Sequence, residues 1–277
     1  MEEFGVTQPT VSRWRQWMDH QDAVAELQRF QERHPNAHIG GLEDLPKHHY
    51  EWEEKHIPTL VRGFLEFRPK YFQDKGQPYS TPKFQQQWAE SILSSLVTGA
   101  RNVILAPVRH GKTELLTQIC IFLWMLDPNI RVLWVSATSK IAKKPIQKMR
   151  QVFMQNQKLI DDYATEGTFV PPLRDPRSWG SEEFTLNTRT DFNISGPNVL
   201  AAGRDGTILS LNADIIIVDD IESKSSVTQL AMRQETKEWW VTQLGSRIEE
   251  HTGLFVIGSR QHPDDLYGTL ISDPYGS

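Results

Sequence analysis

The segment from Ala106 to Thr113 constrains the fold of this chain more than any other feature of its sequence. It follows the apolar run Asn102–Leu105 and precedes the apolar segment Leu115–Ile119, which predicts a strand, a tight loop and then a helix. This is the context of a phosphate-binding P-loop, where backbone N–H groups and a helix N-terminus attract phosphate. A helix start without a ligand is the simpler alternative. The predicted nucleotide-binding residues are Ala106, Pro107, Val108, Arg109, His110, Gly111, Lys112 and Thr113.

Within this loop, two side chains have specific expected roles. We expect Lys112 to reach the β- and γ-phosphates of ATP and the hydroxyl of Thr113 to hold Mg²⁺.

A second motif lies further along the chain, where the β-branched run Ile215–Val218 is followed by Asp219 and Asp220. Such a run predicts a strand buried on both faces of a parallel sheet, and open α/β sheets bind ligands at the carboxyl ends of their strands. We expect Asp219 to position Mg²⁺ and Asp220 to deprotonate the attacking water, with Glu222 as an alternative base. An acidic turn after a buried strand is common by itself. Together, however, the two motifs predict a Mg²⁺-dependent ATPase.

The composition sets broader limits. A chain of 277 residues can form one α/β domain with an N-terminal extension. Because the net charge is −5, any contact with nucleic acid must be local. The single cysteine, Cys120, lies in a predicted helix, so we expect an intracellular chain without disulfides. The apolar run Ile119–Leu126 is too short to cross a bilayer, and we find no signal peptide.

The N-terminal region, residues 1–78, is predicted to be a helical arm, and residues 79–277 the ATPase domain. Phe4–Trp14 resembles the turn and recognition helix of a helix-turn-helix, although a capped surface helix is the alternative, since the first helix of that motif is missing. Helices are predicted near residues 21–32 and 56–67. The pair His48-His49 lacks the spacing of a zinc site.

An aromatic residue and a glutamine, Phe84 and Gln85, open the helix predicted at residues 86–96. The amide of Gln85 can both donate to and accept from the edge of adenine, so these two residues are candidates for adenine recognition. A polar helix start without a ligand is the alternative.

A basic helix is predicted after the strand Arg131–Thr138. Its Lys140, Lys144 and Lys148 recur every fourth residue and therefore lie along one side. Such a stripe could contact a DNA backbone without reading bases, or could be a solvated surface.

The remaining elements complete an alternating pattern. Strands are predicted at Phe184–Asn187 and Pro197–Ala202, followed by a glycine-rich loop at Gly203–Thr207. One long helix is predicted at Gln229–Ile248, and a last strand at Gly253–Gly258.

With these pieces in order, residues 79–277 resemble the ATPase domain of the large terminase subunit of tailed bacteriophages. The resemblance is carried by Ala106–Thr113, by Ile215–Asp220 and by Val256–Gly268, which is similar to that family's coupling motif and the following loop. It implies an α/β fold of the P-loop NTPase (ASCE/RecA-like) class, with a mainly parallel sheet flanked by helices and an N-terminal helical extension.

The resemblance also implies a motor that pumps double-stranded DNA into a procapsid. Arg109 would then sense the γ-phosphate, and Ser259, Arg260 and Gln261 would couple hydrolysis to domain movement. The implied partners are DNA, the portal protein and the small terminase subunit. A homo-oligomeric ring is expected on the portal and a monomer in isolation. The implied location is the host cytoplasm, transiently at the procapsid portal, not the mature virion or a membrane.

Two departures from the family pattern affect these expectations. The family's nuclease domain has no counterpart before Ser277, so no nuclease activity is expected of this chain. Where many members have a Gly-Arg pair, Ser210-Leu211 stands here, so Arg204 is the candidate for an arginine finger acting on a neighbouring subunit. The alternative functions are a helicase-like DNA-remodelling ATPase and a DNA-binding adaptor with a degenerate nucleotide fold.

Overall fold

A computed structural model describes residue 42 and residues 44–164, 166–173, 178–191, 193–206 and 212–272. The helix-turn-helix-like start, the helix predicted near residues 21–32 and the pair Ser210-Leu211 lie outside these residues. Among the helices that are described, none combines the length and apolar character needed to cross a membrane.

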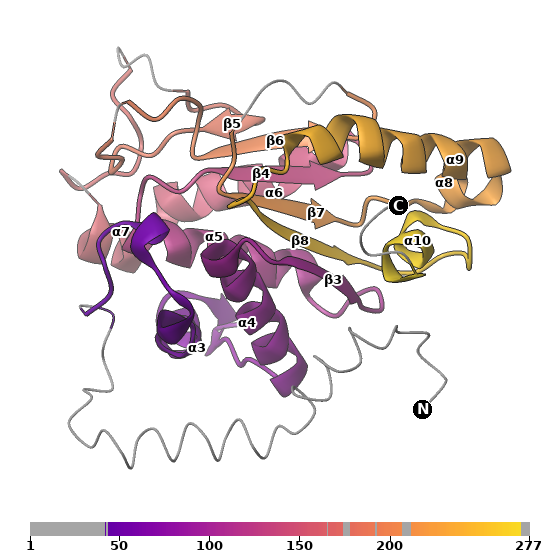
Figure 1. Ribbon diagram of the computed structural model, residues 1–277. Coiled ribbons are helices and arrows are strands. Elements are labelled where there is room, and N and C mark those ends of the chain that lie inside the picture. Colours follow the sequence, from indigo (N-terminus) through magenta and orange to yellow (C-terminus); the bar gives the residue numbers. More distant parts are fainter. Residues whose placement is uncertain are drawn as a thin grey trace.

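The molecule is built on a six-stranded sheet in which five strands are parallel (Figure 1). Only β5, at one edge, runs antiparallel to its neighbour. The strand order is β3 (Arg101–Leu105), β8 (Gly253–Gly258), β7 (Ile215–Asp219), β4 (Val132–Ser136), β6 (Val199–Gly203) and β5 (Glu183–Phe184). The predicted mainly parallel sheet is confirmed, and β8 lies between the P-loop strand and the acidic strand.

Helices cover both faces of this sheet, as Figure 1 shows with α3, α4 and α5 on one side and α9 on the other. The first face carries α3 (Ile57–Tyr71), α4 (Lys83–Thr98), α5 (Lys112–Leu126), α6 (Ser139–Gln155) and α7 (Gln157–Tyr163). The second face carries α9 (Leu230–Trp239) and α10 (Leu266–Ser272), with α8 (Lys224–Thr228) leading into α9.

The two hydrophobic cores explain why the strands are apolar throughout. In β7, Ile215 and Ile217 belong to the core under α5, whereas Ile216 and Val218 belong to the core under α9. All five residues of this strand are buried. Alternate side chains point to opposite faces, so a strand covered on both faces must be apolar at every position.

The described part of the predicted arm packs onto the helices that cover the sheet. Phe64 and Phe67 of α3 meet Phe122 of α5, with ring centroids 5.7 and 5.3 Å apart. A short hairpin, β1 (Gln73–Asp74) with β2 (Gln77–Pro78), then leads to α4. The domain boundary at residue 78 stays a prediction.

The prediction of a single helix at residues 229–248 is wrong for the second half of this range. After α9 the chain forms a π-helical turn at Trp240–Leu244 and a 3-10 turn at Gly245–Arg247. Trp239 and Leu244 are both buried although they are five residues apart. A wider turn brings residues at that spacing to the same face, whereas a regular α-helix does not.

Candidate nucleotide site

Three adjacent strands end side by side at the candidate site. Leu105 of β3 pairs with Gly258 of β8, and Asp219 of β7 pairs with Ile257 of β8. The residues that follow these positions, Ala106, Ser259 and Asp220, therefore meet at the carboxyl edge of the sheet.

The loop between β3 and α5 has two residues in the left-handed region. Gly111, which precedes the first helical residue, has φ 73°, and Arg109 has φ 65°. For a residue other than glycine this conformation is uncommon and costs about 1 kcal/mol. A Cβ at Gly111 would also lie 2.9 Å from Nε2 of Gln85, so a larger residue there would have to displace the end of this side chain.

Lys112 points back across the mouth of the loop. Its Nζ donates to the carbonyl of Ala106 (3.2 Å) and to Oγ of Ser259 (2.7 Å), and lies 3.4 Å from Oδ1 of Asp220. The residue is only 5% exposed. A buried ammonium held by carbonyl and hydroxyl oxygens can transfer its hydrogen bonds to phosphate oxygens.

Thr113 and Asp219 form the second contact of the site, with Thr113 Oγ1 donating to Asp219 Oδ2 at 2.6 Å. Oδ1 of Asp219 is buried and has no hydrogen-bond partner among the described residues. Burial raises the pKa of Asp219 to about 7 and Asp220 adds to this, whereas Thr113 and Lys112 oppose it. A buried carboxylate oxygen without a partner, beside a hydroxyl, suits a hard cation such as Mg²⁺.

Asp220 lies next to this pair at the end of β7, with φ 46°. Its N–H donates to the carbonyl of Ile257 (3.0 Å), and its Oδ1 accepts from the N–H of Ser259 (3.1 Å). The side chain is 43% exposed, so water reaches this carboxylate.

The carboxylate of Glu222 has different surroundings from that of Asp220. It is buried, and its two carboxylate oxygens accept from Oγ of Ser226 (2.5 Å) and from the N–H of Leu266 (3.0 Å). These contacts tie α8 and the start of α10 together. The geometry therefore favours Asp220 over Glu222 as a base.

Ser259, the first residue of the predicted coupling segment, lies at the centre of the site. Its Oγ donates to the carbonyl of Ala106 at 2.8 Å and accepts from Lys112. Arg260 is exposed and donates to the carbonyl of Pro263, and the N–H of Gln261 donates to Asp265. In the described part of the chain, Ser259 is the one of these three predicted coupling residues whose hydrogen bonds reach the P-loop.

Asp265 has a structural role at the start of α10. The residue is fully buried, and its carboxylate accepts from the N–H groups of Gln261, His262 and Gly268. In the described part of the chain, no group of three acidic, histidine or cysteine residues could hold a metal ion.

The predicted adenine-binding residues lie beside the loop. Phe84 is 37% exposed and contacts His110, with ring centroids 5.9 Å apart. Gln85 is buried, donates to the carbonyl of His110 (2.8 Å) and accepts from Arg68 (2.7 Å). One N–H and one lone pair of its amide remain for a ligand. Adenine recognition by these residues stays a prediction.

The predicted arginine and lysine residues have unequal surroundings. Arg109 is exposed on the loop. Arg204 donates to Oγ1 of Thr236 in α9 of the same chain. On α6, Lys140, Lys144 and Lys148 are all exposed, and Lys148 also forms an ion pair with Glu114 of α5. Their roles as sensor, arginine finger and DNA contacts stay predictions.

Comparison with known proteins connects this arrangement to one solved structure. No family model and no curated protein matches the sequence. The structure is similar to the crystal structure of the HK97 bacteriophage large terminase, with a TM-score of 0.50 and 18% sequence identity. The match covers 77% of this chain. The chain has the fold of a large terminase. It spans 40% of the length of the HK97 terminase. The predicted α/β architecture, a mainly parallel sheet flanked by helices, is therefore the fold of that terminase.

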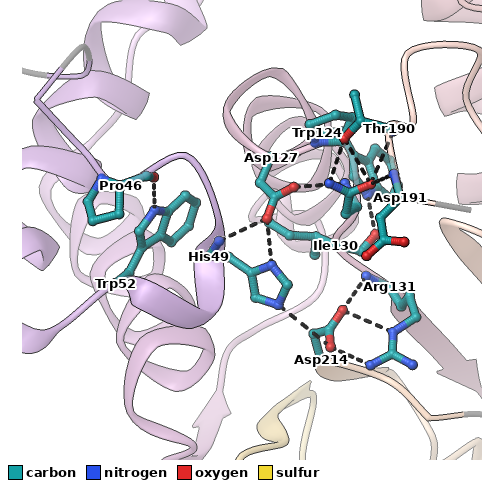
Figure 2. Close-up of polar contacts among 12 residues, drawn as sticks. Pro46, His49, Trp52, Trp124, Asp127, Ile130, Arg131, Thr190, Asp191 and Asp214 are labelled. Atoms are coloured by element: carbon teal, nitrogen blue, oxygen red, sulfur yellow. Dashed lines mark hydrogen bonds and ion pairs between the residues drawn. The ribbon is translucent and has the colours of Figure 1, made fainter. Parts of the chain in front are cut away.

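Sequence reasoning missed a polar cluster at the opposite end of this terminase fold, drawn in Figure 2. Nδ1 of His49 donates to Asp127 at 2.7 Å, and its Nε2 lies 3.6 Å from Asp214. Arg131 binds the same Asp214 through its side chain and its N–H. Burial lowers the pKa of His49, but the two carboxylates outweigh this and raise the pKa to about 9. The imidazolium therefore joins the starts of β4 and β7 to the segment before α3.

Arg68 was missed as well. It lies in α3, which the sequence assigned to an arm without chemistry, yet its guanidinium contacts Gln85 beside the loop. Neither His49 nor Arg68 has a local sequence signal, because their partners are distant in the chain.

Proposed function

We propose that this chain is the ATP-hydrolysing motor domain of a viral terminase large subunit, which drives double-stranded DNA into a procapsid. The proposal combines the terminase fold with the chemistry of the strand ends. Within it, the portal protein, the small terminase subunit and neighbouring copies in a ring are the partners, and the host cytoplasm is the place of action.

One observation carries the proposal. Lys112 and Thr113 begin α5, Asp219 and Asp220 stand at the end of β7, and Ser259 follows β8. Lys112, Asp220 and Ser259 contact one another, and beside them Thr113 donates to Asp219. A phosphate-binding loop joined in this way to two strand-end carboxylates is what Mg²⁺-dependent hydrolysis of a nucleoside triphosphate requires.

Each residue of the site would have its own role in ATP hydrolysis. Lys112 would exchange its contacts with Ala106 and Ser259 for the β- and γ-phosphates of ATP. Thr113 and Asp219 would hold Mg²⁺, which supplies charge neutralisation at the phosphates. Asp220 would orient the attacking water and accept its proton.

Ser259 offers a direct connection from hydrolysis to movement. It bonds both the lysine that would bind the γ-phosphate and the carboxylate that would activate water. When Lys112 moves its bonds to phosphate, Ser259 loses a donor, so the end of β8 responds to the state of the nucleotide.

Steady-state ATP hydrolysis with Mg²⁺ tests the proposal in wild type, Lys112→Ala and Asp220→Asn over a range of protein concentrations. We expect both variants to lose turnover, Asp220→Asn by a factor of about 10²–10⁴ with ATP still bound. Lys112→Ala should lose binding as well. Specific activity should rise with protein concentration if an arginine acts in trans.

Arg204→Ala tests the proposed arginine finger, because it should abolish the rise of specific activity with protein concentration. A wild-type protein that binds no nucleotide in equilibrium dialysis would contradict the motor proposal altogether.

A further inference from the structure

Arg68 is a buried cation, and among the described residues its hydrogen-bond partners include no carboxylate. The residue is 0% exposed. Its Nε donates to Gln118 (2.6 Å), and its Nη1 donates to Gln85 (2.7 Å) and Thr81 (3.1 Å). Fully buried arginines are rare unless they are paired, because removing the charge from water is costly. Such an arrangement therefore calls for a role beyond packing.

The surroundings of the guanidinium hold it in one orientation. Its Cζ lies 4.5 Å from the centroid of the Tyr79 ring. Burial lowers the pKa of Arg68 to about 10, and the group still carries its charge at neutral pH. Nη2 is buried without a hydrogen-bond partner among the described residues. The cation is therefore fixed by neutral acceptors, of which Gln85 is one.

From Gln85 the contact continues into the P-loop. The amide accepts from Arg68 through Oε1 and donates through Nε2 to the carbonyl of His110 at 2.8 Å. The arginine therefore fixes which way round the amide lies, because only with this orientation does the NH₂ group face the loop.

The contact between Gln85 and the His110 carbonyl lies beside a strained residue of the loop. His110 lies between Arg109 and Gly111, which both have positive φ. A positive φ is relaxed for Gly111 but strained for Arg109, and strained backbone persists only where surrounding contacts fix it. The contact of Gln85 with the His110 carbonyl is such a contact.

We propose that Arg68 is a positioning residue that acts through Gln85 to hold the P-loop in its phosphate-receiving conformation. The inference rests on the proposed nucleotide site and gives α3, in the region before residue 79, a part in it. Arg68 touches neither phosphate nor metal in this scheme.

The contacts from Arg68 through Gln85 to the His110 carbonyl are called the relay here. Two variants interrupt the relay at different points. Arg68→Met removes the donors while keeping a long side chain. Gln85→Glu keeps an acceptor for Arg68 but cannot donate to the His110 carbonyl, so it removes the contact with the loop. Measurements without nucleotide separate this loss from any loss of adenine recognition by Gln85. Thr81→Val is the matched control, because it removes another acceptor of Arg68 without touching the loop.

Two measurements are made on each variant: Mg-ATP affinity, and hydrogen exchange of peptides spanning residues 106–113 without nucleotide. We expect Arg68→Met and Gln85→Glu to bind Mg-ATP about tenfold more weakly, the effect of one lost hydrogen bond to a charged or positioned group, and to exchange faster. Thr81→Val should match wild type in both. The double variant Arg68→Met/Gln85→Met should bind no more weakly than the single variants Arg68→Met and Gln85→Met.

The outcomes separate the relay from the nucleotide site itself. If Lys112→Ala abolishes binding but Arg68→Met and Gln85→Glu bind and exchange like wild type, the relay is overturned and the site stands. If wild type binds no nucleotide, the proposed function fails, and exchange alone decides whether Arg68 orders the loop. Should Arg68→Met fail to fold, Gln85→Glu still tests the loop end, since it gives Arg68 a charged acceptor.

Discussion

At the scale of single residues, the site distinguishes two neighbouring carboxylates by their surroundings. Asp220 is partly exposed next to Lys112, whereas both oxygens of Glu222 are occupied by Ser226 and Leu266. Sequence spacing left both open as the base, because distance along the chain does not show which carboxylate faces water. Lys112, Thr113 and Asp219 were placeable from sequence, since strand-loop-helix order fixes them locally.

This contrast predicts the behaviour of Glu222→Gln. We expect the variant to lose about 1–3 kcal/mol of unfolding free energy, because an amide cannot accept at both buried contacts. Its ATP turnover per folded molecule should remain. Urea unfolding and steady-state kinetics on the same preparation check both points, with Asp220→Asn as the comparison. Loss of turnover at full stability would instead make Glu222 the base.

At the scale of elements, His49 joins the segment before α3 to the starts of β4 and β7. The 3-10 turn that carries it, His49–Glu51, has no apolar stripe to pack and depends on these polar contacts. The sequence predicted the strands well because a buried parallel strand must be continuously apolar. It could not predict this junction, because Asp127 and Asp214 become neighbours of His49 only in the folded chain. The π-helical turn after α9 escaped prediction for a similar reason, since the burial of Trp239 and Leu244 is set by the far face of the sheet.

The junction predicts a pH dependence of stability. The pKa of His49 is raised to about 9 from 6.5, while His49 and Arg131 hold the pKa of Asp214 at about 2. A raised histidine pKa gives stability that is fully present below pH 6.5 and is lost as the pH rises through about 9. Relative to His49→Gln, we expect wild type to be more stable by up to about 3 kcal/mol at pH 6, with the difference fading by pH 10.

Urea unfolding of both proteins from pH 6 to 10 measures this difference. Because the two proteins share every other titrating group, the difference isolates His49. A stability gap that does not change with pH would show that the contact is not ionic.

At the scale of the whole molecule, the net charge of −5 disfavours DNA, so any grip must come from a local cationic surface. Lys140 and Lys144 of α6 are exposed. The charge of Lys148 is balanced by an ion pair with Glu114, and partial burial lowers the pKa of Lys148. The sequence placed all three lysines on one side of a helix, but only the packing of α6 on α5 distinguishes the third from the others.

We therefore expect Lys140→Ala/Lys144→Ala to weaken binding of non-specific duplex DNA and to reduce the slope of log affinity against log salt by roughly two. Lys148→Ala should change the slope less, since its charge already has a partner. Fluorescence anisotropy with labelled duplex between 50 and 200 mM salt provides the measurement. An unchanged slope in the double variant would remove α6 from the DNA-binding surface.

The His49 junction has a mechanical consequence as well. It fixes the amino ends of β4 and β7, whereas Ser259 and Asp220 lie at the opposite ends of β8 and β7, where nucleotide is expected. A sheet that is fixed at one edge and displaced at the opposite edge bends about the fixed edge. If turnover displaces the end of β8, we expect the sheet to bend about its amino edge. In the proposed motor, weakening the His49 junction would then shorten the movement without changing the nucleotide site.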